Sequence, residues 1–331
     1  MARGYDATAS PRRPDAAGPA LFSGGPEASA AWPFAPNPMP ATTAARSRRV
    51  SHPPIIWTMR RSGSTTLATL VADFSDFPRI EHEPFNPGRV LHPIVERFVA
   101  SRDEDRLREE IREALAARPV LKHCFDILPV PLHRVLFEVT CDLGYRHILL
   151  ERRDEAARLL SLALARQTNA WGKAQANGIY AEIFAGTRAL EPIPEQDLLA
   201  ECRTAEQRRR MLAELFRAAG VRPFLLVFEE LFEAPEAGRR RLSALFDWLE
   251  QERDAQAFAA RSTESLTTTG QDTGSIVTYV PNIDPLMATL RAAQPETSPF
   301  EGLTAGTPQA PGQTGGATSG VTGGATGGAT G

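Results

Sequence analysis

A short stretch after an apolar run combines the residue types that bind anions. Residues 53–59, PPIIWTM, are followed by two arginines and then by SGSTT, residues 62–66. Glycine lets the backbone approach an anion closely, and serine and threonine offer hydroxyl donors beside their amides. A helix that begins after Gly63 would add its N-terminal amides and its dipole at the same point. The segment 60–66 is therefore predicted to bind an anion of the phosphate type.

This segment does not match the Walker A loop of ATPases and kinases. The Walker A pattern is G-x-x-x-x-G-K-[ST], so with Gly63 as its second glycine the first would fall on Thr58 and the lysine on Ser64. Neither position carries the required residue. A kinase with a degenerate P-loop remains an alternative, and it would also need magnesium ligands.

A second polar element follows another apolar run. Arg152 and Arg153 come at the end of ILLERR, and Ser161 follows Arg153 by eight residues. An arginine at the carboxyl end of a strand and a serine on the next helix can converge on one phosphate. The spacing predicts a second anion-binding position formed by Arg153 and Ser161.

The body of the chain alternates between two patterns. Apolar runs occupy 53–59, 119–125, 146–152 and 222–230, and helical patterns occupy 64–74, 93–117, 131–143, 154–170, 195–219 and 235–252. Strands buried on both faces and separated by helices indicate a parallel sheet. We predict an α/β, P-loop-like fold of three layers, in one domain over 53–293. Ligands of such sheets gather at the carboxyl ends of the strands, where 60–66 and Arg153 fall.

The two ends of the chain differ from this body. Residues 1–52 are rich in Ala, Pro, Gly and Ser, and the segment 294–331 ends in a Gly-Ala-Thr repeat. Such segments bury too little apolar surface to offset the entropy lost on ordering. Both are predicted to be disordered.

Composition excludes several classes of partner. The formal net charge is −3, which leaves no basic excess for a nucleic acid. The cysteines Cys124, Cys141 and Cys202 lack CxxC spacing, which predicts buried free thiols in a reducing compartment and no zinc site. Neither a signal-peptide core nor a run of about 18 apolar residues appears. We expect a cytoplasmic protein with no membrane span and no metal; its oligomeric state stays open.

The anion-binding segment and the Arg153–Ser161 pair together resemble the sulfotransferases that use 3′-phosphoadenosine 5′-phosphosulfate (PAPS). RRSGSTT resembles their 5′-phosphosulfate-binding loop, and the eight-residue spacing resembles their 3′-phosphate-binding element. ARQTNAW, residues 165–171, is similar to the bacterial nodulation-type branch. The Arg-Lys-Gly segment of eukaryotic cytosolic members has no counterpart here, which favours the nodulation and carbohydrate branch.

The resemblance implies roles for individual residues. It implies that Arg61 lies against the oxygen that bridges sulfur and phosphorus, and that Arg153 and Ser161 hold the 3′-phosphate. The residues implied around the 5′-phosphate are Arg60, Arg61, Ser62, Gly63, Ser64, Thr65 and Thr66.

The resemblance also implies a general base. A Glu-Pro segment after the first helix places an acid near the acceptor hydroxyl in this family, and Glu83 in RIEHEPFN matches it. Glu81 is its rival, and His123 competes because some members use a histidine of the corresponding strand. Pro84 restricts the residue before it, so we expect extended backbone at Glu83.

Together these motifs predict transfer of the sulfuryl group of PAPS to a hydroxyl of a carbohydrate or other small acceptor. The transfer is expected to be in line, with a carboxylate base and no metal. The alternative from another class is a catalytically silent protein of the same fold that binds a nucleotide or a partner. The acceptor itself is not determined by the sequence.

Overall fold

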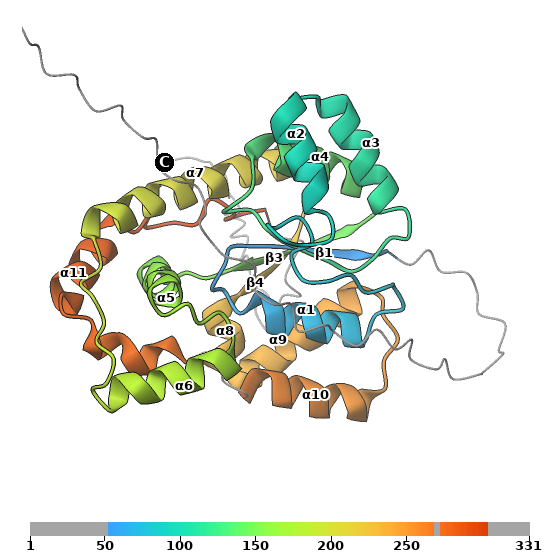
Figure 1. The fold of residues 1–331 in the computed structure, drawn as a ribbon. Helices are drawn as coiled ribbons and strands as arrows, with labels where there is room; N and C mark the ends of the chain where they lie inside the picture. Colours follow the sequence, from blue (N-terminus) through green and yellow to red (C-terminus); the bar gives the residue numbers. More distant parts are fainter. Residues whose placement is uncertain (1–51, 268–271, 304–331) are drawn as a thin grey trace, which may run out of the picture. The chain divides into compact units, whose positions relative to one another are not determined.

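The structure, a computed structural model, describes residues 52–267 and 272–303 of the 331-residue chain. Its described residues contain a four-stranded sheet in the order β2-β1-β3-β4, with every neighbouring pair parallel (Figure 1). The strands are β1 (Pro54–Thr58), β2 (Leu121–Cys124), β3 (Arg146–Glu151) and β4 (Phe224–Val227). Each lies inside one of the predicted apolar runs. The predicted α/β fold with a central parallel sheet is confirmed.

Alternate residues of β1 enter different cores, which is why the strand is apolar on both faces. Ile55 and Trp57 pack against α2 (His92–Ser101), α3 (Glu104–Ala114), α4 (Val130–Asp142) and the end of α7 (Glu195–Ala218). Ile56 packs on the other face against α1 (Ser64–Asp73), α8 (Phe228–Phe232), α9 (Pro235–Trp248) and α10 (Ala255–Thr267). Figure 1 shows helices on both faces of the strands, as expected for three layers.

A third core forms among helices at the end of the sheet where β3 leads into α5. It joins α5 (Glu155–Thr168), α6 (Lys173–Phe184) and the first half of α7 with the 3₁₀ helix η1 (Thr273–Tyr279) and α11 (Ile283–Ala293). The sequence prediction missed α6, α10 and α11. Of these, α6 has the weakest amphipathic pattern, with only Ala176, Tyr180 and Ile183 buried, so tertiary packing rather than periodicity defines it.

Two predicted boundaries were wrong. The single helix predicted over 93–117 is α2 and α3, because Arg102 takes a left-handed conformation at φ 59° and Asp103 then caps the amide of Arg106 at 3.0 Å. The run 222–230 is a strand only to Val227, after which α8 begins.

The predicted disordered tail, 294–331, begins too early. Phe300 is 1 % exposed in the core that contains Trp57, and Ser298 donates to both carboxylate oxygens of Glu151 at 2.9 Å. Full burial of a phenylalanine contributes about 1.5–3 kcal/mol, which offsets part of the entropy lost when this segment is ordered. Residues 304–331, and residues 1–51 of the predicted N-terminal arm, lie outside the described residues.

Two further predictions concern the cysteines and a membrane span. The cysteines are free, and Cys124 and Cys202 are buried while Cys141 is half-buried. No helix of the described residues is both long enough and apolar enough to cross a bilayer.

Candidate anion-binding site

The loop between β1 and α1 lies at the point where the order of the strands in the sheet reverses. From β1 the chain crosses to β2 on one side, whereas β3 continues to β4 on the other. The crevice outside the carboxyl ends of β1 and β3 is the usual ligand position of such a sheet. Residues 60–63 follow β1 there, and Arg152 and Arg153 follow β3.

Gly63 begins α1 in a way that only glycine permits. Its φ is 73°, and a Cβ added to it would lie 2.6 Å from Cε2 of Phe232. Phe228 and Phe232 of α8 pack on each other, with ring centroids 5.0 Å apart, against this glycine. No side chain of the described residues caps α1, and its first turn carries no acid. The first amides of α1 are therefore available to an anion.

Two arginines donate hydrogen bonds to backbone carbonyl groups of the loop. Arg158 Nη1 donates to the carbonyl of Arg60 at 3.2 Å, and Arg152 Nη1 donates to that of Arg61 at 3.0 Å. Arg61 itself has a left-handed φ of 67°. Because both carbonyls are engaged, the loop is fixed before any ligand arrives.

The arginines are part of a buried chain of charges. Arg158 binds Glu155 through two hydrogen bonds of 2.7 and 2.6 Å, and Arg209 donates to the same carboxylate at 2.5 Å. Burial alone would raise the pKa of Glu155, but the hydrogen bonds and charges of these arginines lower it. Removing one member would leave a buried charge without its partner, which typically costs about 3–5 kcal/mol. The network connects the loop to the start of α5.

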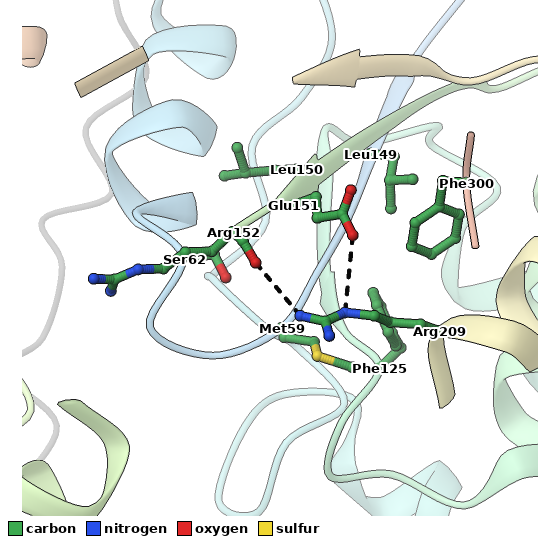
Figure 2. A pocket seen from close by; sticks show the side chains of 9 residues that line it. All are labelled: Met59, Ser62, Phe125, Leu149, Leu150, Glu151, Arg152, Arg209 and Phe300. Carbon is green, nitrogen blue, oxygen red and sulfur yellow. Dashed lines mark hydrogen bonds and ion pairs between the residues drawn. The ribbon is translucent and has the colours of Figure 1, made fainter. Parts of the chain in front are cut away.

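A small cavity lies behind the loop (Figure 2). Its volume is about 10 Å³, the room needed by one water molecule. Ser62 lines it, is 1 % exposed, and its Oγ has no hydrogen-bond partner among the described residues. Figure 2 shows Arg209 reaching the carbonyl of Arg152 and the carboxylate of Glu151 across this space. Ser62 is thus left with its backbone for the anion, while exposed Thr65 and half-buried Thr66 can also offer hydroxyls.

Arg61 and Ser161, predicted to serve different phosphates, are in direct contact. Arg61 Nε donates to Ser161 Oγ at 2.9 Å, and Ser161 Oγ lies 2.9 Å from Thr273 Oγ1 of η1. Burial lowers the pKa of Arg61, an effect that Tyr180 of α6 opposes. Arg61 is therefore directed from the loop towards α5 and α6.

The predicted pair of Arg153 and Ser161 is not assembled in the structure. The Arg153 side chain is 60 % exposed and pairs with Glu230 at 3.1 Å, and its amide donates to Glu229. Its neighbour Arg152 is the arginine that turns towards the loop, where its guanidinium lies 4.3 Å from the ring of Phe228. Side chains of successive residues at a strand end point to opposite sides, so only one of the two can face the loop.

Arg60 also differs from its prediction. Its Nε donates to Asp126 Oδ2 at 2.9 Å, and its amide donates to Oδ1 at 3.3 Å. Asp126 lies just beyond β2, so it ties the β1 loop to the neighbouring strand. The guanidinium of Arg60 is therefore paired with a carboxylate through one hydrogen bond, and the second bond comes from its backbone amide.

Lys122 bridges Glu83 and the first turn of α1. Lys122 of β2 is 3 % exposed, and its Nζ lies 2.6 Å from Glu83 Oε1 and 2.9 Å from Thr65 Oγ1. Cys124 Sγ also donates to Oε1, at 3.2 Å, and Asn86 Nδ2 donates to Oε2, at 2.5 Å. A carboxylate, an ammonium group and an uncapped helix start thus meet at one place.

The environment of Glu83 sets its acidity. Burial alone would raise its pKa, but the charge and hydrogen bond of Lys122, with help from Cys124 and Arg60, lower the pKa to about 2. The expected extended backbone is wrong, because Glu83 has a φ of 55°. A non-glycine residue in this left-handed region is held there by its surroundings, here by the contacts of its carboxylate.

The rival base candidates lie elsewhere. Glu81 accepts from the amide of Val90 and pairs with Arg89 at 3.5 Å, so it closes its own loop. His123 is buried, and its Nε2 lies 2.9 Å from Nδ1 of His133. Burial, and then His133, hold its pKa well below the usual range. His123 faces the core with Trp57, on the sheet face opposite to Lys122.

Sequence reasoning missed Lys122, Asp126 and Arg158. A signal for Lys122 was present: the chain has 37 basic residues but only two lysines, and this one interrupts a buried strand. A buried lysine requires a partner, which is a reason to search for a carboxylate. Asp126 and Arg158 gave no such signal, since acids after strands and arginines on helices are common.

No protein-family model matches the chain, and no curated protein sequence matches it. The resemblance to sulfotransferases therefore rests on local features alone: the loop 60–66, the spacing from Arg153 to Ser161, the Glu-Pro segment at Glu83 and the segment 165–171.

Proposed function

We propose that the protein is a PAPS-dependent sulfotransferase that moves the sulfuryl group to a hydroxyl of a carbohydrate or another small hydroxylated acceptor. The observation that carries the proposal is the contact of Lys122 with both Glu83 and Thr65, at 2.6 and 2.9 Å. It brings a carboxylate to the start of an uncapped helix, so a base and an anion receptor share one site. A receptor for phosphate alone does not require the carboxylate.

The loop supplies what the 5′ end of such a donor needs. The amides of Gly63, Ser64 and Thr65 begin α1 without a capping side chain, and the hydroxyls of Thr65 and Thr66 lie beside them. Arg61 adds a full charge that is fixed by Ser161. Donors positioned in advance stabilise charge without reorganising at the moment of reaction.

The proposed step balances as follows. The acceptor oxygen forms a bond to sulfur while the bond from sulfur to the 5′-phosphate oxygen breaks, and its electron pair stays on the phosphate. The acceptor proton passes to a Glu83 carboxylate oxygen. Arg61 stabilises the leaving phosphate electrostatically, since an arginine does not readily release its proton. Alignment and charge stabilisation do most of the work in such transfers.

One observation favours a second candidate, a nucleotide-binding protein without turnover. Glu83 has a pKa lowered to about 2, whereas a general base works best with a pKa near the working pH. This candidate keeps the anion receptor and treats Lys122 and Glu83 as a structural ion pair.

Transfer of labelled sulfate separates the two. The full chain is incubated with PAPS labelled at sulfur and with a panel of sugars and other hydroxylated acceptors. The proposal expects labelled acceptor and adenosine 3′,5′-bisphosphate in equal amounts. Tight binding of the bisphosphate with no labelled product from the panel would support the second candidate, and lack of binding would contradict both.

A further inference from the structure

Lys122 is the single direct connection between Glu83 and the anion receptor among the contacts described. Its ammonium group has three N–H donors, of which one meets Glu83 Oε1 and another meets Thr65 Oγ1. Because Thr65 Oγ1 accepts from Lys122, its own O–H is left to donate, and Thr65 is exposed at the first turn of α1. The order from lysine through threonine to anion is the one in which each hydrogen bond strengthens the next.

Other groups also face Glu83: Cys124 and Arg60 lower its pKa, whereas the buried imidazole of His123 is neutral. Cys124 comes from β2 with Lys122, Arg60 comes from the β1 loop, and Asn86 and His82 belong to its own segment. The pKa of His82 is lowered to about 4, by burial and then by Lys122, so this imidazole is neutral near pH 7. Arg60 is already paired with Asp126. Lys122 is therefore the main charge that stabilises the Glu83 carboxylate.

We propose, on the basis of the proposed function, that Lys122 makes Glu83 a base only after the sulfuryl donor has bound. Without a donor, the ammonium group belongs to Glu83, and the carboxylate is a poor proton acceptor. An anion at the start of α1 draws the same ammonium group towards Thr65, and Glu83 then accepts a proton from the acceptor hydroxyl. Lys122 is a positioning residue in this scheme, since it acts through Glu83.

The physical reason is that two anions then share one cation in a buried site. A second negative charge near Lys122 weakens the attraction that keeps Glu83 ionised, and burial, which favours the neutral acid, is then opposed less strongly. Both changes raise the proton affinity of Glu83. The scheme predicts an order of binding, in which the donor binds before the acceptor can react. In the empty site the ion pair with Lys122 keeps the Glu83 carboxylate from being protonated.

The first test measures Glu83 in the wild-type full chain. Carbon-13 NMR of labelled glutamate side chains follows each carboxyl from about pH 4 to 7, with and without saturating inorganic sulfate, which stays a dianion over this range. The Glu83 signal is assigned by its loss in Glu83→Gln, and occupancy is followed at the Gly63 amide. We expect sulfate binding to raise the proton affinity of Glu83 at least about a hundredfold, so that a titration that lies below this pH range without sulfate enters it. Saturation at Gly63 with no change at Glu83 would overturn the inference and leave the proposed function standing.

The second test uses the two lysines of the chain as a matched pair. Lys122→Gln is expected to abolish the sulfate-dependent change at Glu83, whereas Lys173→Gln, which removes the same charge from an exposed position, is expected to keep it. A full-sized change in Lys122→Gln would exclude Lys122 as the link. If that variant does not fold, the wild-type titration decides alone. Failure of sulfate and of adenosine 3′,5′-bisphosphate to perturb Gly63 would overturn the anion receptor, and with it both proposals.

Discussion

Two helices begin at the same edge of the sheet, and their first turns are built in opposite ways. α5, which follows β3, is closed by acids of the chain: Asp154 accepts from the amide of Ala157 at 2.8 Å, and Glu155 is paired with buried Arg158. α1, which follows β1, begins at Gly63 with no acid in its first turn and no capping side chain among the described residues. Both helices have a positive N-terminal end, but only one leaves it available.

The difference shows that an anion receptor depends on which acids are absent as much as on which bases are present. At α5 the carboxylates of the chain take the place that a phosphate would occupy. At α1 the carboxylate of Glu83 contacts Lys122 rather than the helix amides. An anion is therefore expected to bind at α1, and a second phosphate near α5 must rely on side chains such as Arg153 rather than on the helix itself.

The largest effect is expected from Glu83→Gln, which keeps the side-chain shape at the open helix and removes its basicity. Turnover should fall at least about a hundredfold, the low end of what general-base catalysis supplies, while adenosine 3′,5′-bisphosphate binding is retained. Steady-state kinetics and calorimetry check the two parts. Glu81→Gln is the control and should stay near wild type. Collapse in Glu81→Gln with normal turnover in Glu83→Gln would pass the role to Glu81.

The second largest effect is expected from a substitution that blocks the uncapped N-terminus of α1 and so weakens binding of the bisphosphate. In Gly63→Ala the new Cβ meets Phe232, so the loop must shift, and bisphosphate affinity should drop at least about tenfold, the equivalent of one charge-assisted hydrogen bond. Gly220→Ala is the matched control, since it has a positive φ of 64° with nothing within 4 Å of the added Cβ. Both variants lose roughly 1–2 kcal/mol of stability to the backbone. Equal affinities in calorimetry would show that the α1 start does not hold the anion.

Substitution of the two arginines after β3 should affect different ligands. Arg152→Ala frees the carbonyl of Arg61 and should weaken adenosine 3′,5′-bisphosphate and AMP alike. Arg153→Ala should weaken only the bisphosphate, by about 1.5–3 kcal/mol, if the exposed guanidinium leaves Glu230 for the 3′-phosphate. Calorimetry with both ligands is the measurement. Unchanged bisphosphate affinity in Arg153→Ala would show that the second anion position has been wrongly assigned.

The smallest effect on the site is expected at the closed helix. Asp154→Ala removes the α5 cap and should cost about 0.5–2 kcal/mol of stability in chemical denaturation, with nucleotide affinity unchanged. A gain of bisphosphate affinity in this variant would mean that the uncapped start of α5 also binds an anion. The difference between the two helices would then not depend on the cap alone.

The sequence predicts the loop and the strands well because both depend on local chemistry. Buried parallel strands are apolar throughout, and Gly63 among serines and threonines marks the start of a helix. The contacts of Glu83 could not be predicted, since Lys122 is 39 residues away and meets it only through the pairing of β2 with β1. The choice between Arg152 and Arg153 fails for a similar reason. Spacing places both at one edge, but the facing direction of each side chain depends on the exact residue at which the strand ends.

The burial of Phe300 has a consequence for how the protein is made. The slot that it fills lies beside Met59, Phe125 and Leu149, which belong to the first half of the chain. Synthesis proceeds from the N-terminus, so β1 to β3 exist long before residue 300 leaves the ribosome. Until then Phe300 cannot cover its slot beside the carboxyl ends of β1 and β3, and apolar surface exposed in this way on a nascent chain is open to chaperones and to aggregation.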